Sequence, residues 1–336
     1  MPVANALSPP RPTVDTLSVL LQRIQSAPPG VPKSLWHGAL VGPVSEFLNR
    51  PGKRFRGRLV SLAWSLAGRD DDPPPELPLL VELLHAGSLI VDDIEDGSIQ
   101  RRGRAVLHRL IGMPAALNIG NWLYFWPQTL LKSLDLPAAT ELDLHRLWGD
   151  AVRVCHEGQA LDLTARIGDL HPSEVISVCR VISDWKTGAL MGMAAELGAT
   201  AAKGDAELIT AVRTFGVRLG VGLQMQNDLG ELTGVAGPIK HPEDLIHGRI
   251  TWPWAWAAER LSAAKFDALQ VRGAKLAAGV GDTAALARDL LAALGKDPLE
   301  PVRAALAEAY RDLAAAAGPH PALANVRAEL DRLIRS

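Results

Sequence analysis

The sequence predicts an all-α protein, on three observations. Apolar residues recur at three- and four-residue spacing along the chain, and no stretch alternates convincingly as a strand does. Proline clusters at Pro9 to Pro12, Pro28 to Pro32 and Pro73 to Pro78 separate the first helices. The C-terminal third is rich in Ala, Leu, Arg and Glu, which are strong helix formers arranged with an apolar stripe.

The composition predicts one large-cored domain. The chain has 336 residues, of which 48% are apolar, and a formal net charge of −2. This balance lacks the charge excess of a nucleic-acid binder, so we expect no nucleic-acid partner. No repeat or composition break marks a second domain. We therefore expect a disordered tail over residues 1–12 and a single helical domain over residues 13–336.

The cysteines and apolar runs indicate the compartment. Cys155 and Cys179 lack metal-ligand or redox spacing, which predicts buried thiols in a reducing compartment, without zinc or a disulfide. No run approaches the ~20 apolar residues of a membrane span, and the first residues lack the features of a secretory signal. The sequence predicts a cytoplasmic protein with no integral membrane segment.

An apolar helix expected from Leu77 to about Asp96 ends in four carboxylates. They are Asp92, Asp93, Glu95 and Asp96. Asp92 and Asp96 are four residues apart, and Asp93 and Asp96 three apart, so the three aspartates project from one helix face about 6 Å apart. Their charges repel one another and the helix C-terminus, which calls for cations or protonation. Hard oxygen ligands at this loose spacing suit Mg²⁺ shared with a phosphate.

Basic residues flank this acidic cluster. Arg101, Arg102 and Arg104 follow it, and an earlier PGKRFRGRL segment supplies Lys53, Arg54 and Arg56. Arginine forks match phosphate oxygens, so the combination points to a ligand that carries phosphate. Taken alone, the PGKRFRGRL segment would be an ordinary basic surface turn.

Two later motifs add candidate ligands. DWKTG places Lys186 beside Thr187 in a long helix, a pair that alone would more often face solvent. GLQMQNDLGE lies in a helix expected from Ala206 to about Leu232. Its polar residues at three- and four-residue spacing share one face and could bind a second Mg²⁺: Gln224, Asn227, Asp228 and Glu231.

In this order and spacing, the motifs resemble the trans-isoprenyl diphosphate synthase family, most closely its eukaryotic-type geranylgeranyl diphosphate synthases. The resemblance spans about Gly52 to Pro253 and covers GKRFR, ELLHAGSLIVDDIEDGSIQRRG with the following NIGNWLYF, HEGQALDL, DWKTG, GLQMQNDLGE and EDLIHGRITWP. It implies an isoprenoid-synthase-type helical bundle around a central cavity. It also implies prenyl diphosphate substrates, up to three Mg²⁺ ions and a homodimer.

The resemblance assigns roles residue by residue. Asp92, Asp93 and Asp96 would hold Mg²⁺ against an allylic diphosphate, with Asn227, Asp228 and Glu231 as the second metal motif. Further contacts to that diphosphate would come from Arg101, Lys186, Thr187, Gln224 and Lys240 or Arg249. Isopentenyl diphosphate would be bound by Lys53, Arg56, His85 and Arg102. The residues expected to be catalytic are Asp92, Asp93, Asp96, Lys186 and Asp228.

The implied chemistry is ionisation, condensation and elimination. Loss of diphosphate leaves an allylic carbocation, which the alkene of isopentenyl diphosphate attacks before a proton is lost. Catalysis then consists mainly of stabilising the leaving group's charge in a dry cavity, because water would trap the cation.

The second acidic motif departs from the family's DDxxD, because Asn227 and Glu231 replace two aspartates. Relatives with such erosion became terpene cyclases, which ionise one prenyl diphosphate and join no second substrate. Trp252, Trp254 and Trp256 could support that alternative through their aromatic faces, or they could pack the core. A third alternative is a non-catalytic partner subunit of another synthase. The intact first motif and the full isopentenyl diphosphate set favour the synthase.

Product length is expected to depend on the residues one turn before Asp92. These are Gly87 and Ser88. The absence of a bulky aromatic there favours a geranylgeranyl-length product, and a ring introduced at Gly87 is expected to fill the cavity and shorten the product.

Overall fold

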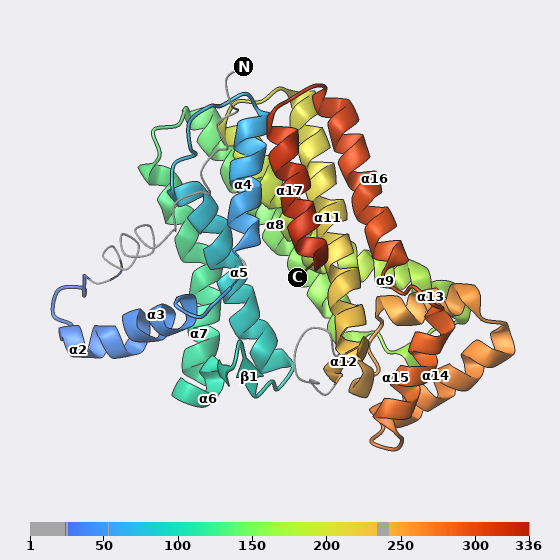
Figure 1. The fold of residues 1–336 in the computed structure, drawn as a ribbon. Coiled ribbons are helices and arrows are strands. Elements are labelled where there is room, and N and C mark those ends of the chain that lie inside the picture. Colours follow the sequence, from blue (N-terminus) through green and yellow to red (C-terminus); the bar gives the residue numbers. More distant parts are fainter. Residues whose placement is uncertain (1–23, 25, 53, 234–241, 336) are drawn as a thin grey trace. The chain divides into compact units, whose positions relative to one another are not determined.

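A computed structural model describes residue 24 and residues 26–52, 54–233 and 242–335. These residues are predominantly helical (Figure 1), so the predicted all-α class is confirmed. The expected tail over residues 1–12 lies outside the described residues, as do Lys53 and Lys240. None of the described helices is long and apolar enough to cross a membrane.

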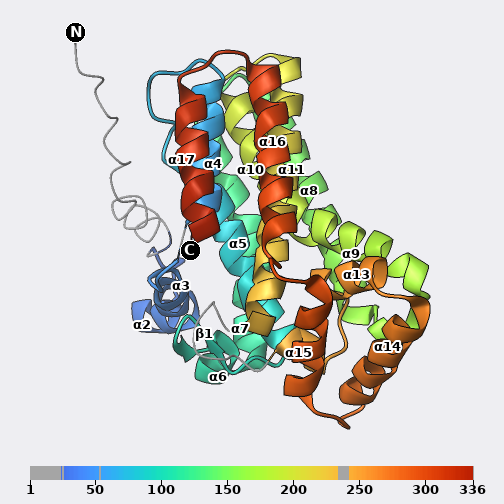
Figure 2. The same cartoon turned by 45° about the vertical axis from the view of Figure 1, so that its right-hand side comes forward.

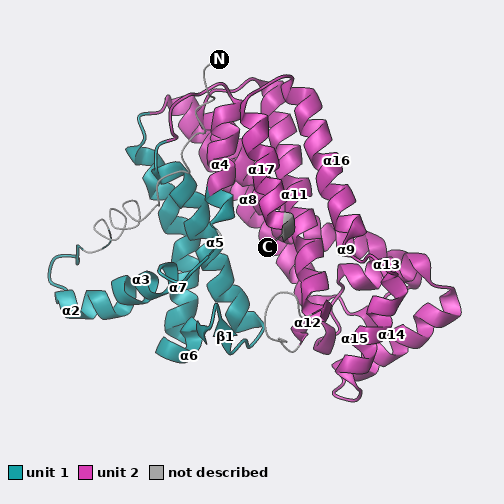
Figure 3. Ribbon diagram, viewed as in Figure 1, with its two compact units in different colours: residues 1–57, 74–135 teal, residues 58–73, 136–336 magenta. Residues whose placement is uncertain are grey.

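The chain forms two compact units, residues 1–57 with 74–135 and residues 58–73 with 136–336 (Figure 3). The expectation of a single domain over residues 13–336 stays a prediction. The elements of the first unit are α2 (Lys33–Trp36), the π-helical turn η1 (His37–Val41), α3 (Gly42–Leu48), α5 (Glu76–Glu95), β1 (Gln100–Arg101), β2 (Arg104–Ala105), α6 (Leu107–Ile111), α7 (Met113–Phe125) and the 3₁₀ helix η2 (Trp126–Ser133).

Most of the long helices belong to the second unit. Its elements are α4 (Phe55–Leu66, which begins in the first unit), α8 (Ala138–Thr164), the 3₁₀ turns η3 (Ile167–Asp169) and η4 (Pro172–Glu174), α9 (Val175–Ser183), the π-helical turn η5 (Asp184–Gly188), α10 (Ala189–Ala201), α11 (Ala206–Thr233), α12 (Glu243–Ile246), α13 (Trp252–Arg260), α14 (Ala263–Ala277), α15 (Thr283–Leu294), α16 (Glu300–Ala317) and α17 (Ala322–Arg335). The predicted helices from Leu77 and Ala206 match α5 and α11 within a residue or two at each end.

In the first unit, α5 packs on α7 through glycines on both helices. A Cβ atom at Gly87 would lie 2.8 Å from the Gly120 carbonyl oxygen, and one at Gly120 would lie 2.7 Å from a Val91 methyl group. Such distances are possible only without side chains. The expectation that a ring at Gly87 would enter a product cavity is therefore wrong, because Gly87 faces the backbone of α7.

In the second unit, α10 is buried on nearly every face, and α11 lies beside both α10 and α16 (Figures 1 and 2). Glycines again allow the close approach. A Cβ at Gly216 of α11 would lie 2.5 Å from the Met191 carbonyl oxygen of α10, and one at Gly220 would lie 2.8 Å from the Cα of Gly188. The local sequence around these glycines therefore does not show which residues they contact, because those residues come from another helix.

Three tryptophans of α13 pack the core. Trp252, Trp254 and Trp256 are all buried, and the Trp254 ring meets Phe266 edge-on at 6.2 Å between centroids. The Trp252 indole donates a hydrogen bond to Ser183 Oγ at 2.9 Å. Core packing therefore accounts for these side chains. Cys179 is buried as predicted, whereas the same prediction is wrong for Cys155, which is half-buried on α8.

The contact between α10 and α11 yields a stability prediction. Gly216→Ala should destabilise the protein by about 1–3 kcal/mol, because the new methyl group overlaps the Met191 carbonyl and the helices must separate. Gly149→Ala on α8 is the matched control, since a Cβ there meets nothing within 4 Å, and it should stabilise by up to ~1 kcal/mol. Denaturant unfolding measures both. Equal stability of the two variants would contradict the packing account.

Candidate active site

The acidic cluster ends α5, where Arg101 from the following hairpin contacts two of its aspartates. Arg101 Nε donates to Asp93 Oδ1 at 2.7 Å, and its NH2 group donates to Asp92 Oδ2 at 3.2 Å. Asp93 is only 1% exposed, whereas Asp92 and Asp96 are half-buried. The second oxygen of Asp93, Oδ2, is buried without a hydrogen-bond partner among the described residues.

Burial raises the pKa of Asp93 to about 6, and the negative charge of Asp92 adds to the rise, against the opposing effect of Arg101. One arginine therefore does not balance the two carboxylates. An additional cation near Asp92 and Asp93 would lower the pKa of Asp93 again.

A short hairpin carries the three arginines that follow the cluster. Its strands β1 and β2 pair Gln100 with Ala105 and Arg101 with Arg104. The two turn residues, Arg102 and Gly103, have φ angles of 54° and 76°, and a two-residue turn of type I′ requires positive φ at both positions. Arginine is unfavourable in this conformation, so local turn propensity does not explain Arg102.

The Arg102 side chain lies against the backbone of the loop that contains GKRFR. A Cβ atom at Gly52 would be 2.8 Å from the guanidinium of Arg102. A side chain at position 52 would displace the flexible end of Arg102 from this position. The end of the loop is tied to α5, because the Gly57 N–H donates to Glu82 Oε1 at 2.7 Å. Among the described residues predicted to bind isopentenyl diphosphate, Arg56 and Arg102 are near enough to act electrostatically on His85.

His85 on α5 has a positively charged surrounding. Burial lowers its pKa well below the ordinary value, and the charges of Arg56, Arg102 and Arg101 lower it further. Partial burial and the neighbouring Arg101 also lower the pKa of Arg102. His85 is therefore a neutral hydrogen-bonding group beside repelling guanidiniums, an arrangement that a bound polyanion would stabilise.

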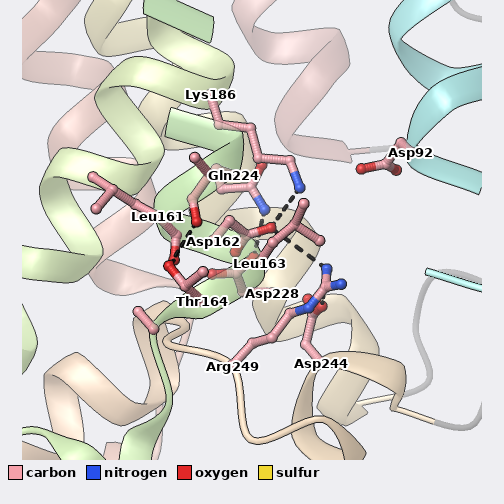
Figure 4. Close-up of polar contacts among 12 residues, drawn as sticks. Asp92, Leu161, Asp162, Leu163, Thr164, Lys186, Gln224, Asp228, Asp244 and Arg249 are labelled. Carbon is pink, nitrogen blue, oxygen red and sulfur yellow. Dashed lines mark hydrogen bonds and ion pairs between the residues drawn. The ribbon is translucent and has the colours of Figure 1, made fainter. Parts of the chain in front are cut away.

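In the second unit, the carboxylate of Asp162 on α8 joins two basic residues (Figure 4). Lys186 Nζ donates to Asp162 Oδ2 at 2.6 Å, and Arg249 NH1 lies 3.4 Å from the same oxygen. Arg249 also lies 3.5 Å from Asp244 Oδ1. The approach depends on Gly158, one turn before Asp162, where a Cβ would lie 2.5 Å from the Lys186 backbone nitrogen.

A chain of polar contacts leads from η5 into α11 and α13. Thr187 Oγ1 donates to Gln224 Oε1 at 2.8 Å. Gln224 Nε2 in turn donates to Asp228 Oδ1 at 2.7 Å (Figure 4). The other oxygen of Asp228 accepts from the Trp252 backbone N–H at 2.9 Å. This network orients Asp228 from both sides.

The acidic residues of α11 have raised pKa values. Burial and the charge of Asp244 raise the pKa of Asp228 to about 7. Burial, with Asp244 and Asp228, raises the pKa of Glu231 to about 8. Asn227 is exposed, whereas its neighbour Asp228 is buried, so the first and second positions of the eroded motif have different surroundings.

The predicted residues thus fall into two clusters, one in each unit. Arg56, His85, Asp92, Asp93, Asp96, Arg101 and Arg102 belong to the first unit, and Lys186, Thr187, Gln224, Asn227, Asp228, Glu231 and Arg249 belong to the second. Sequence reasoning did not name Asp162 or Asp244 as site residues. Asp162 lies in HEGQALDL and Asp244 in EDLIHGRITWP. Asp162 is identified by its contacts to Lys186 and Arg249, which are distant in the sequence, and Asp244 by its contact to Arg249, five residues later.

The donor groups fit a metal ion that shares its ligands with a substrate. Among the described residues, no three or more His, Cys, Asp or Glu side chains are grouped so that they could hold a metal ion. The buried, unpaired Asp93 oxygen and the raised pKa values of Asp228 and Glu231 nevertheless indicate carboxylates short of positive charge. Mg²⁺ suits such sparse oxygen sites, because it takes its other ligands from water and phosphate.

Comparison with known proteins gives the family. The family model described as "Polyprenyl synthetase" matches residues 37–286, and the chain belongs to this family. It is 32% identical over 213 residues to "Geranylgeranyl pyrophosphate synthase janG" of Penicillium janthinellum, covering 63% of this chain and 56% of that protein. It is 30% identical over 215 residues to "Geranylgeranyl pyrophosphate synthase" of Eremothecium gossypii, covering 63% of this chain and 67% of the relative.

Solved structures share the fold over nearly the whole chain. A decaprenyl diphosphate synthase from Rhodobacter capsulatus aligns with a TM-score of 0.78 at 21% identity, covering 96% of this chain and 95% of that one. A geranylgeranyl pyrophosphate synthetase from Pyrococcus horikoshii aligns with a TM-score of 0.72 at 20% identity, covering 96% of each chain. The helical isoprenoid synthase fold implied by the sequence motifs is thereby confirmed.

The raised pKa of Glu231 gives a pH prediction. Its pKa is 4.5 in an ordinary environment and about 8 in the folded protein, so the native state binds more protons than the unfolded chain between these values. Glu231 should therefore cost stability progressively as the pH rises from about 4.5 to about 8. Glu231→Gln should flatten this decline in the metal-free protein.

Melting temperatures at several pH values measure the effect. Glu207→Gln, on the exposed first turn of the same helix, is the control and should keep the wild-type pH dependence. A Glu231→Gln variant with the wild-type slope would show that Glu231 ionises without cost in the fold.

Proposed function

We propose that this chain is a Mg²⁺-dependent prenyltransferase that joins an allylic diphosphate to isopentenyl diphosphate. The observation that carries the proposal is the presence of two separate cationic clusters. Arg56 and Arg102 surround a neutral His85 in one unit, and Lys186 and Arg249 flank Asp162 in the other. Condensation needs two diphosphate-binding groups, whereas ionisation of a single prenyl diphosphate needs one.

The resemblance of the motifs supports the division of labour between these clusters. Lys186, Thr187, Gln224 and Arg249 would bind the allylic diphosphate, together with Arg101 and the aspartates of α5. Arg56, His85 and Arg102 would bind isopentenyl diphosphate. The curated relatives named geranylgeranyl pyrophosphate synthase support the same substrate class.

The proposed reaction breaks the bond between the allylic carbon and the diphosphate oxygen. The alkene of isopentenyl diphosphate then forms the new carbon–carbon bond, and one proton passes to the departing diphosphate, which restores a double bond. Lys186 and Arg249 would stabilise the negative charge that develops on the leaving diphosphate. Mg²⁺, when bound, would neutralise diphosphate charge; the motifs assign it to Asp92, Asp93 and Asp96 in the first unit and to Asn227, Asp228 and Glu231 in the second.

The terpene cyclase alternative rests on Asn227 and Glu231, which replace aspartates of the usual motif. The tryptophans that could have supported it are buried in the core, so they do not favour a cyclase. The arginine and histidine cluster around His85 has no role in a cyclase, which binds one diphosphate. These observations favour the condensing enzyme.

Substrate dependence tests this function. Purified protein with Mg²⁺ and farnesyl diphosphate should form a longer prenyl diphosphate only when isopentenyl diphosphate is added. Arg56→Ala should raise KM for isopentenyl diphosphate by roughly ten- to a hundredfold and change KM for the allylic substrate much less, because it removes a charge-assisted bond of about 1.5–3 kcal/mol.

The control is Arg109→Ala, an exposed arginine on α6, which should leave both KM values unchanged. Products analysed by mass spectrometry separate the alternatives. A hydrocarbon or alcohol formed from farnesyl diphosphate alone would identify a cyclase, and an inactive purified chain that stimulates another synthase would identify a partner subunit.

We also propose that the product has geranylgeranyl length. The size of the side chain at position 88, rather than at position 87, would set this length. Ser88 is half-buried, and its Oγ is hydrogen-bonded to the His85 carbonyl at 2.9 Å on its own helix. Ser88→Phe should therefore shorten the product without breaking a contact between helices, as mass spectrometry of the chain lengths would show. Gly87→Ala should instead lower the melting temperature. An unchanged product length in Ser88→Phe would contradict the assignment.

We further propose a homodimer that forms through α7. This helix carries three exposed apolar side chains, Met113, Leu117 and Phe125, which are 55%, 38% and 67% exposed. Leu117 follows Met113 by four residues, and Phe125 follows Leu117 by eight. This spacing gives one apolar stripe, which is unusual for a solvent-facing surface. The proposed location is cytoplasmic, in keeping with two cysteines that form no disulfide.

Phe125→Asp should shift the protein from dimer to monomer, because it places a charge in the proposed apolar contact, at its most exposed side chain. Light scattering coupled to size-exclusion chromatography measures the mass. Val280→Asp, at a residue that is 64% exposed in the second unit, is the control and should leave the mass unchanged. A dimeric Phe125→Asp variant would exclude α7 from the interface.

A further inference from the structure

Arg50, just after α3, is a buried ion with an unusual set of partners. The residue is 1% exposed, although arginine is among the residues least often buried. Its Nε and NH2 groups donate to the carboxylate of Glu46, at 3.2 Å and 2.8 Å, and its guanidinium lies 5.1 Å from the Phe47 ring centroid. A buried guanidinium is tolerated only when its donors are satisfied.

The remaining donors of Arg50 bind the backbone of the hairpin. Its NH2 group donates to the Ala105 carbonyl at 2.8 Å, and NH1 donates to the Arg101 carbonyl at 3.4 Å. Arg101 belongs to β1 and Ala105 to β2, so one side chain holds both strands. Glu46 extends the contact, since Arg104 NH1 lies 3.5 Å from its carboxylate.

The hairpin needs such support because its own interactions are few. Each strand has two residues, and an isolated two-stranded hairpin is marginally stable in water. Its turn also carries Arg102 in the left-handed region, which is unfavourable for a residue with a Cβ atom. The conformation that aims Arg101 at Asp93 and Arg102 at Gly52 therefore depends on contacts from outside the hairpin.

We propose that Arg50 is a positioning residue that fixes the hairpin and thereby aims Arg101 and Arg102 at the diphosphates. Arg50 itself would touch no substrate, since its donors are used by Glu46 and the two carbonyl groups. The inference rests on the proposed function for the role of Arg102, but not for the contact between Arg50 and the hairpin.

Two substitutions separate the contacts. Arg50→Met keeps an apolar stem of similar length and removes every hydrogen bond. Arg50→Lys keeps the charge beside Glu46, but an ammonium group cannot bind Glu46 and both carbonyls in the planar fork of arginine. The control is Arg69→Met, whose exposed guanidinium pairs with Asp71 and lies over Trp64.

Steady-state kinetics tests the positioning role. Arg50→Met should raise KM for isopentenyl diphosphate about tenfold or more, with Arg50→Lys intermediate and Arg69→Met unchanged. The decisive comparison is the double variant with Arg102→Ala. If Arg50 acts through Arg102, the double variant should have the KM of Arg102→Ala alone within about twofold. Independent, multiplying effects on KM would overturn the proposal.

Amide hydrogen exchange tests the same contact without any activity. Peptides spanning residues 99–106 should exchange faster in Arg50→Met, while peptides of α11 keep the wild-type rate. Unchanged exchange in the hairpin would overturn the proposal even if KM changed. If Arg50→Met does not fold, the same two measurements on Arg50→Lys decide. If the wild-type chain catalyses no condensation, the proposed function fails, and exchange still decides whether Arg50 holds the hairpin.

Discussion

The burial of carboxylates beside one another is the constraint on which both clusters depend. Asp93, Asp228 and Glu231 all have raised pKa values, and in each case loss of solvent is the largest cause. The protein compensates only in part, with Arg101 on Asp93 and hydrogen bonds from Trp252 and Gln224 on Asp228. These buried carboxylates destabilise the folded protein when no cation is bound and stabilise it when cations are bound. The folded protein therefore lacks positive charge beside them, which a metal-bound diphosphate can supply.

Backbone contact at glycines sets the positions of the compensating groups. Gly158 brings α8 against Lys186, so that Asp162 reaches Lys186, and Gly220 brings α11 against Gly188, so that Gln224 reaches Thr187. In the first unit the Arg102 guanidinium lies against the backbone at Gly52. The polar contacts of the second unit depend on its small residues, since a methyl group at Gly158 or Gly220 would separate the helices that carry the charges.

The sequence predicted what depends on local pattern and missed what depends on distant partners. The ends of α5 and α11 and the acidic and basic clusters followed from spacing, because helical periodicity is a local property. The sequence did not predict the hairpin, since strands of two residues show no detectable alternation of apolar and polar residues. Gly87 was misread because its partner, Gly120, lies in another helix. The roles of Asp162 and Arg50 were not predicted for the same reason, because their contacts join residues that are 24 and 55 positions apart.

The central claim is that these carboxylates are held for a cation that arrives with a diphosphate. Thermal unfolding of the wild-type chain with Mg²⁺, with inorganic pyrophosphate and with both together tests it most directly, because ligands that bind the native state raise the melting temperature. The account predicts that the two together raise the melting temperature by more than the sum of their separate effects, since each supplies charge that the other lacks. A melting temperature unchanged by both together at millimolar concentrations would contradict it.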